Sequence, residues 1–239
     1  MQPQPVIQSL RKYASTFHPV IPFTPGRDRL LQADLTTANK GLGEEIYTDT
    51  DAFSNYIETG LKKAGCRYAI GGYDERRGIY SANQLFDAGA EPRTLHLGID
   101  IWGPAGTPVY AFIGGRVHSF AFNKNKGDYG ATLILLHQLD GFAFHTLYGH
   151  ISIKDIENLT ASQYVVRGQQ IAHFGQPAEN GHWPTHLHFQ VIIDMELKTG
   201  DYPGVCMFSE RERYLQNCPD PDLILQMNQY IHTNTALTQ

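Results

Sequence analysis

The sequence predicts a mainly β protein, α+β overall, whose core is an antiparallel β sandwich or partly open barrel with helical extensions at both ends. Between about residues 94 and 193, short segments of alternating polarity are separated by Gly, Pro, Asn and Asp turns. This pattern is typical of antiparallel sheets. Apolar residues recur at helical spacing on either side of that region. We therefore expect an N-terminal arm and helix over 1–92, a β core over 93–195 and a C-terminal helical extension over 196–239.

The N-terminal region contains one well-marked helix. Residues 1–45 are rich in proline and turn residues, which predicts an irregular arm packed on the rest of the protein. A helix follows, because Thr48 or Asp49 can cap it and Gly65 can end it near Ala64. The apolar residues of its buried face are Phe53, Tyr56, Ile57 and Leu61.

The central region changes to a period of two. Residues 95–101 alternate between apolar and polar side chains, which predicts a continuous strand with an apolar back. Further strands are predicted over 107–112, 115–122, 131–137, 141–148, 164–166, 169–174 and 186–193. After this region, Ser209 and Glu212 have the spacing of a capping box that opens a helix, and residues 219–222 open another.

Composition excludes several classes of protein. Hydrophobic content of 41% and charged content of 18% are those of a globular protein. A net charge of −5 gives no basic surface for nucleic acid, and no apolar run approaches the roughly 20 residues that span a bilayer. The N-terminus lacks the pattern of a secretory signal, so we expect a cytoplasmic protein. Three scattered cysteines, Cys66, Cys206 and Cys218, predict free thiols.

Histidines are concentrated in the predicted β core. Nine of the eleven lie between His96 and His188. His96 and Asp100 are four residues apart, which places them on one face of a regular strand, and Gly98 between them leaves space for an ion. Imidazole and carboxylate groups together are ligands that zinc prefers.

A second pair, His186 and His188, also shares one strand face. Two histidines and one carboxylate leave a coordination position for water, as a hydrolytic zinc site requires. The spacing does not decide which histidine of the pair binds the metal. The other one, together with His150, can take and return protons during hydrolysis.

These segments, in their order and spacing, resemble the M23 (lysostaphin/LytM-type) zinc metallopeptidases over about residues 93–195. The resemblance implies a small antiparallel β core, a Zn²⁺ cofactor, and hydrolysis of a peptide or amide substrate, peptidoglycan-derived peptides included. It implies that His96, Asp100 and His188 bind zinc and that His150 and His186 are the catalytic pair. The motifs that carry it are His96-Leu97-Gly98-Ile99-Asp100, Gly106-Thr107-Pro108-Val109, Gly114-Gly115-Arg116-Val117, Tyr148-Gly149-His150, Gly168-Gln169-Gln170-Ile171 and His186-Leu187-His188-Phe189.

Two features depart from that family. Many peptidoglycan-cleaving members carry a tyrosine shortly before the first zinc ligand, whereas residues 87–95 contain none, so Tyr73 or Tyr80 is the alternative. The flanks are similar to the peptidase-like segment of multidomain phosphotransferase/aminotransferase fusion proteins, which argues against a cell-wall substrate. His182 and Trp183 precede the histidine pair in a turn-rich loop, where they can form the wall of a substrate groove.

Two other classes share parts of this pattern. Non-haem iron oxygenases also use two histidines and a carboxylate, but they usually have a closer first pair and a basic residue soon after the distal histidine. A non-catalytic zinc-binding module usually has a closed shell of four ligands, whereas two histidines here remain outside the ligand set. The leading hypothesis is a zinc metallopeptidase. Nothing in the sequence specifies an oligomeric state.

Overall fold

A nine-stranded sheet runs through the computed structural model, which describes residues 3–82 and 91–236. Its strand order is β10-β7-β8-β9-β12-β5-β2-β1-β14, and two smaller sheets have the orders β11-β6 and β13-β4-β3. The strands are β1 Leu30–Ala33, β2 Tyr68–Gly71, β3 Glu75–Arg76, β4 Arg93–His96, β5 Ile99–Trp102, β6 Pro108–Tyr110, β7 Gly115–Asn123, β8 Gly130–Leu139, β9 Phe142–Ile151, β10 Tyr164–Val165, β11 Gln170–His173, β12 His186–Ile192, β13 Val205–Met207 and β14 Ile231–Ala236. The α-helices are α1 Pro3–Tyr13, α2 Glu44–Tyr47, α3 Thr50–Ala64, α4 Arg211–Asn217 and α5 Asp222–Leu225. Short 3-10 helices are η1 Ala14–Thr16, η2 Gly78–Ala82, η3 Ile153–Asp155, η4 Phe208–Glu210 and η5 Asn228–Tyr230.

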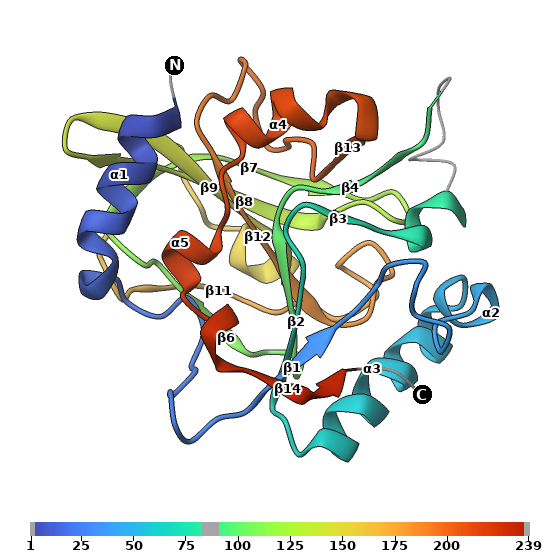
Figure 1. Ribbon diagram of the computed structural model, residues 1–239. Helices are drawn as coiled ribbons and strands as arrows, with labels where there is room; N and C mark the ends of the chain where they lie inside the picture. Colours follow the sequence, from blue (N-terminus) through green and yellow to red (C-terminus); the bar gives the residue numbers. More distant parts are fainter. Residues whose placement is uncertain (1–2, 83–90, 237–239) are drawn as a thin grey trace.

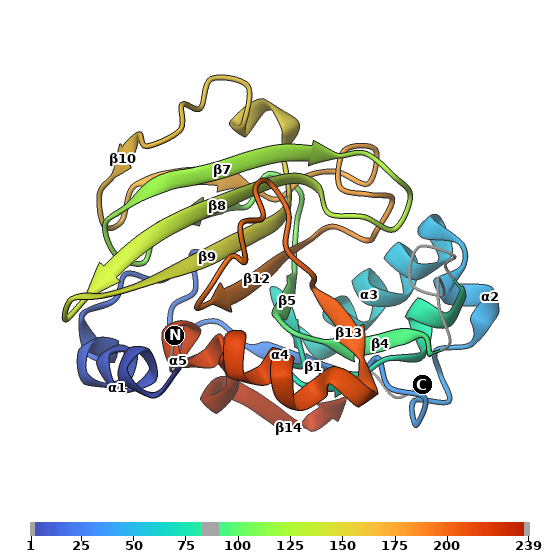
Figure 2. The same cartoon turned by 90° about the horizontal axis from the view of Figure 1, so that it is seen from above.

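The predicted mainly β fold is confirmed, and the pairings from β10 to β2 are antiparallel as expected. The long strands β7, β8 and β9 form a curved layer in Figure 2. At the other end, β1 is parallel to both β2 and β14. The order of the described strands is linear, so this sheet is open and mixed, not a closed barrel.

The N-terminal region is more ordered than its proline content suggested. The prediction of an irregular arm over 1–45 is wrong, because α1 is a helix and β1 is a strand inside the sheet. Val6 and Leu10 of α1 are buried in the main core. The four residues of β1 are too short to show a period, and pairing with two neighbours holds them extended. Figures 1 and 2 place α1 and α3 at opposite sides of the molecule.

Helix α3 follows its prediction closely. The side chain of Asp49 accepts a hydrogen bond from Ala52 N at 2.8 Å and so caps the first turn. Gly65 ends the helix in the left-handed conformation, at φ 61°. Phe53 and Ile57 are buried and pack with residues of β1 and β2 in a second core cluster. The helix therefore fixes the connection between the two parallel strands β1 and β2.

A helical extension was expected over 196–239, but the C-terminal region contains strands as well as helices. Helix α4 starts near the predicted place, but no side chain caps it, and Ser209 N instead donates to Glu91 Oε1 at 3.2 Å. Strand β13 pairs with β4, and β14 forms the edge of the large sheet next to β1. Pairing with strands that are distant in the sequence therefore determines the structure of this region. Local periodicity predicted its helices but not its strands.

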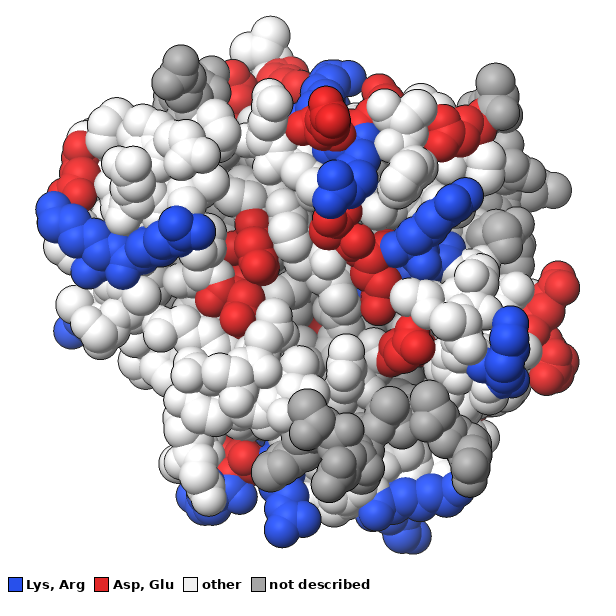
Figure 3. Space-filling view, in the orientation of Figure 1, with Lys and Arg blue, Asp and Glu red and all other residues white. Residues whose placement is uncertain are grey.

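Other expectations concern the surface and the cysteines. All three cysteines are free, and Cys206 and Cys218 are buried, as predicted. Within residues 3–82 and 91–236, none of the helices combines the length and the apolar character that crossing a bilayer requires. On the face in Figure 3, acidic and basic side chains are interspersed among uncharged ones. Neither sign dominates that face.

Deleting residues 1–45 is expected to lower the melting temperature strongly, because the deletion removes β1 and leaves β2 and β14 without their shared neighbour. Thermal unfolding followed by circular dichroism measures the effect. Deleting only residues 1–16 is the matched control, since it removes α1 but keeps β1, and it should cause a smaller loss. An unchanged melting temperature for the longer deletion would contradict this account.

Candidate metal centre

Strands β12 and β5 bring the candidate residues together through alternation and register. Along β12, Leu187 and Phe189 point into the main core, so His186 and His188 point to the other face. In the antiparallel pairing, His188 lies opposite Asp100, and His186 lies opposite Trp102. Directly opposed residues on one face are close neighbours. The pairing register therefore places an imidazole beside the carboxylate.

The segment between His96 and Asp100 is not one continuous strand, and that prediction is wrong. The chain breaks after His96, so β4 joins the small sheet while β5 joins the large one. A Cβ on Gly98 would lie 2.5 Å from Cε1 of His188. The absence of a side chain on Gly98 therefore leaves space for the imidazole ring of His188. The spacing had predicted that this space would hold an ion.

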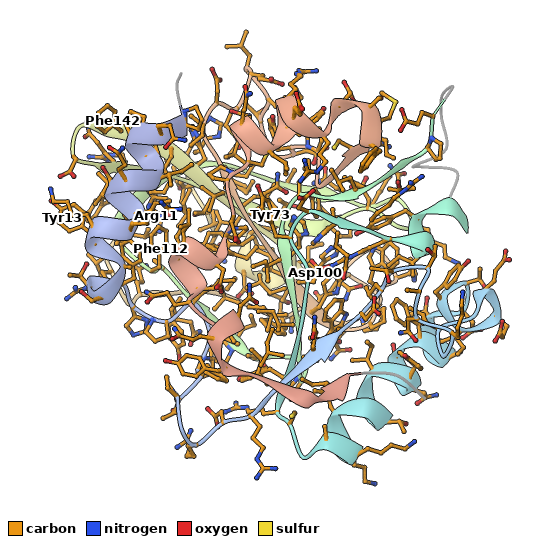
Figure 4. The ribbon with its side chains drawn as sticks, viewed as in Figure 1. Arg11, Tyr13, Tyr73, Asp100, Phe112 and Phe142 are labelled. Atoms are coloured by element: carbon orange, nitrogen blue, oxygen red, sulfur yellow. The ribbon has the colours of Figure 1, made fainter. Side chains whose placement is uncertain are left out.

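One possible metal-donor atom from each of His96, Asp100 and His188 lies close to the other two. His96 Nε2 lies 3.0 Å from His188 Nδ1 and 3.3 Å from Asp100 Oδ1, and His188 Nδ1 lies 3.0 Å from Asp100 Oδ1. Each of the three residues is at most 3% exposed. Among the described residues they form the one group of histidine, cysteine or carboxylate side chains with the geometry to hold a metal ion. Figure 4 labels Asp100 near the centre of the molecule.

Hydrogen bonds outside the cluster fix which ring nitrogens carry protons. His96 Nδ1 lies 2.9 Å from the carbonyl oxygen of Gly72, which can only accept, so this nitrogen donates. The amide nitrogen of Gln190 donates to Pro203 O at 3.1 Å, so its Oε1 accepts from His188 Nε2 at 2.8 Å. The remaining nitrogen of each ring therefore presents a lone pair. Two lone pairs and a carboxylate oxygen converge without a proton between them, and such an arrangement calls for a cation.

The electrostatics favour the metal-binding forms of these groups. Burial lowers the pKa of His96 to about 4, so its ring is neutral near pH 7. Burial alone would raise the pKa of Asp100, but the positive charges that His96 and Arg77 can carry outweigh it and hold that pKa well below its usual range. The cluster therefore combines neutral imidazole with an ionised carboxylate, as metal ligation requires.

These donors fit a zinc ion. Zinc bonds to imidazole nitrogen and carboxylate oxygen are about 2.0–2.2 Å long, so two donors on a tetrahedral zinc lie roughly 3.3–3.5 Å apart. The three separations in the structure, 3.0, 3.0 and 3.3 Å, are close to that value. Three protein donors leave a fourth position open for water or substrate.

Arg77 is part of the site, although sequence reasoning did not identify it. Its side chain is 1% exposed, and its Nη1 donates to Asp100 Oδ2 at 2.5 Å while its Nε donates to Glu75 Oε2 at 2.6 Å. The guanidinium holds one oxygen of Asp100, and the other oxygen then faces the two imidazoles. Arg77 follows the short strand β3 and carries no recognisable motif, so only the tertiary contact reveals it.

His150 and His186 lie side by side next to the cluster. Their ring centroids are 4.1 Å apart, and His186 Nε2 is 3.9 Å from Asp100 Oδ1. His150 Nδ1 donates to Asn180 O and His186 Nδ1 donates to Pro184 O, both at 2.7 Å. Each Nε2 therefore keeps its lone pair. Burial is the main cause that lowers the pKa of both rings, so both are neutral bases near pH 7.

A β-bulge sets the direction of His150. Between Ala131↔Ile151 and Leu133↔Tyr148, β9 advances by one residue more than β8. His150 lies in this extra stretch with φ 61°, a left-handed conformation that non-glycine residues seldom adopt. The direction of the His150 side chain therefore does not follow from the two-residue period of a regular strand.

The cluster opens into a pocket of about 790 Å³, lined by His150, His186, Tyr80, Tyr129 and Trp183 among others. Tyr80 accepts a hydrogen bond from Arg77 Nη1 at 3.1 Å. The Tyr73 hydroxyl donates to Cys218 O at 2.7 Å, and Tyr73 does not line the pocket. Of the two predicted tyrosines, the structure thus brings Tyr80 to the site. Sequence reasoning missed Tyr129, whose hydroxyl lies 3.4 Å from His188 Nε2.

Comparison with protein families gives one match over this region. Residues 94–199 match the model of peptidase family M23. This segment belongs to peptidase family M23. The match spans β4, β5 and β12 and therefore includes all three donors of the cluster and both neighbouring histidines.

Curated relatives of the M23 segment come from two species of Neisseria. The DD-carboxypeptidase/endopeptidase Mpg of Neisseria meningitidis serogroup B is 33% identical over 100 residues, as is Mpg of Neisseria gonorrhoeae. Each match covers 42% of this chain but 20% of the relative. The chain thus spans about a fifth of the length of these proteins.

Two peptidases are among the solved structures that are similar to part of this chain. A zinc-containing peptidase from Vibrio cholerae is 31% identical over 41% of this chain and 27% of that one, with a TM-score of 0.33. The catalytic domain of lysostaphin from Staphylococcus simulans is 22% identical over 51% of this chain and 80% of that one, with a TM-score of 0.35.

Proposed function

We propose that this protein is a zinc-dependent metallopeptidase that hydrolyses a peptide bond. The observation that carries the proposal is the convergence of His96 Nε2, His188 Nδ1 and Asp100 Oδ1 within 3.3 Å of one another, with no proton between them, beside a pocket. The M23 family match over the same segment supports it. His96, Asp100 and His188 are the proposed zinc ligands.

Bound zinc supplies a Lewis acid that polarises the substrate carbonyl and lowers the pKa of a water molecule to about 7. The protein supplies the proton transfers. His150 and His186 each keep a lone pair on Nε2, because a carbonyl holds the Nδ1 proton, so either ring can take a proton and pass it to the leaving amine. Tyr80 lines the same pocket and is the proposed hydrogen-bond donor to the oxygen of the reacting carbonyl.

An open ligand set distinguishes this proposal from a non-catalytic zinc module. A structural zinc site usually has four protein ligands, whereas the cluster here has three donors and a pocket next to them. His186 is not a member of the group of converging donors, which consists of His96, Asp100 and His188. It remains free to act on the substrate.

The proposed substrate is a short peptide, and peptidoglycan-derived peptides are the first class to assay. The Neisseria relatives are named as a DD-carboxypeptidase/endopeptidase, which supports this class. The deep position of the cluster favours a short substrate, because each of the three ligands is at most 3% exposed. A panel of muropeptides and simple dipeptides, read by mass spectrometry with and without a chelator, tests the proposal. Chelator-sensitive cleavage supports it, and the absence of cleavage across the panel counts against it.

Replacing His150 or His186 by glutamine is expected to leave zinc in place and to lower turnover by about 10²- to 10⁴-fold, the usual contribution of a general acid or base. Elemental analysis and the peptide assay measure the two quantities. The matched control is His173→Gln, because His173 pairs with Asp155 at 3.0 Å, outside the pocket. Unchanged turnover in the His150 and His186 variants would refute their catalytic role.

A further inference from the structure

A second pocket adjoins the pocket at the cluster. The second pocket, of about 800 Å³, shares Phe53, Ile79, Gly127 and Trp183 with the first. The shared residues therefore lie between the two pockets, and they belong to the lining of the pocket that holds the proposed zinc site.

Two different parts of the chain contribute the shared residues. Phe53 on α3 and Ile79 on η2 precede the M23 segment, and Trp183 and Gly127 belong to loops inside it. The hydroxyl of Thr50, on the first turn of α3, donates to His182 O at 2.8 Å. This hydrogen bond links α3 to the loop that carries Trp183. The N-terminal region thus completes a site whose ligands come from the M23 segment.

The boundary between the two pockets is uncharged and mainly apolar. None of its four shared residues carries a charge, and Phe53 and Ile79 are only 2% and 5% exposed. Against these four residues a charged group of the substrate would lose its hydration without gaining a charged partner. An apolar group has no such hydration to lose, and it would contact the rings of Phe53 and Trp183. Charged side chains line other parts of the two pockets, namely Arg93, Asp128 and Asp201 in the first and Lys126 in the second.

The loop that carries Trp183 is fixed to the catalytic centre through Asn180, which is fully buried. Asn180 Oδ1 accepts from Trp183 N at 3.0 Å, and its Nδ2 donates to Trp183 O at 3.1 Å. The carbonyl oxygen of the same residue holds His150 Nδ1 at 2.7 Å. Trp183 and His150 therefore have a fixed spatial relation.

We propose that Phe53, Ile79 and Trp183 form a subsite for an apolar side chain of the substrate, next to the scissile bond. This inference rests on the proposed metallopeptidase function and defines its substrate class. It assigns specificity to residues of α3 and η2 that lie outside the M23 segment. Peptides with an aliphatic or aromatic residue at this position are then preferred over those with glycine or lysine.

Binding of hydroxamates to the zinc-loaded protein tests the subsite without a known substrate. The probes are the hydroxamates of Nα-acetyl-leucine, Nα-acetyl-glycine and Nα-acetyl-lysine, which share one zinc-binding group, and calorimetry gives their Kd values. The leucine probe is expected to bind at least about tenfold more tightly than the glycine probe, the gain from burying one aliphatic side chain. The lysine probe should gain much less.

Trp183→Ala is expected to reduce the preference for leucine over glycine to less than about threefold, with unchanged zinc content and unchanged affinity for the glycine probe. Phe53→Ala, with folding verified by circular dichroism, is the second variant. Phe142→Ala is the matched control, because Phe142 is an exposed phenylalanine away from the pocket, at the far edge in Figure 4.

The outcomes separate the two proposals. If none of the probes binds the zinc-loaded protein, the open zinc site fails and the proposed function fails with it. If the probes bind but leucine has no advantage, or if Trp183→Ala and Phe53→Ala both keep that advantage, the subsite is refuted while the proposed function stands. Preference for the lysine probe would also overturn the subsite.

Discussion

Asp100→Asn is expected to lower zinc affinity by more than about 100-fold. Losing the outer-shell partner of a zinc ligand usually costs about 10- to 100-fold in affinity, and this change removes a proposed ligand and its negative charge. Asparagine keeps the shape of the side chain, but it leaves Glu75 as the remaining carboxylate partner of the buried Arg77, so circular dichroism has to verify the fold of this variant. Competition with a chromophoric chelator measures the affinity, and elemental analysis measures the zinc retained.

The control for this variant is Asp155→Asn. Asp155 also pairs with a histidine, His173, at 3.0 Å, but it lies outside the cluster. Its zinc affinity should match that of the unmodified protein. His188→Gln should reproduce the loss seen for Asp100→Asn, because His188 Nδ1 lies 3.0 Å from Asp100 Oδ1 in the same donor set. One tightly held zinc in both variants would refute the ligand assignment.

Arg77→Met is expected to lower the free energy of unfolding of the metal-free protein by about 3–5 kcal/mol, the usual effect of removing one partner from a buried ion pair. Arg77 is 1% exposed, and without it the carboxylates of Asp100 and Glu75 lose their buried counter-ion. Zinc brings positive charge to Asp100, so the loss should be smaller in the zinc-loaded protein. Urea denaturation with and without zinc measures both values.

Arg76→Met is the matched control for that experiment. Arg76 is the exposed neighbour in sequence, and its guanidinium lies over the ring of Phe208, 5.5 Å from its centroid. Exposed substitutions of this kind usually change stability by less than about 0.5 kcal/mol. If Arg77→Met were equally mild with and without zinc, Arg77 would not be the residue that holds Asp100 in place.

Much of the β core and the candidate site could be predicted because the relevant signals are local. Alternation along β12 placed His186 and His188 on one face, and the capping residue and stop of α3 marked that helix within a residue or two. These signals depend on side chains a few positions apart in one element. Such patterns can be read from the sequence because a strand or helix keeps the same residue period in the folded protein.

By itself, the sequence determined the mainly β core, helix α3, and which histidines and carboxylate to consider for a metal. Only the tertiary structure decided that the chain bends at Gly98, that β1 joins the sheet in parallel, and that Arg77 holds Asp100. It also separated His188, which faces the carboxylate, from His186, which lies beside His150. The physical reason is that these features depend on strand register and on contacts between residues far apart in the chain, which no local period encodes.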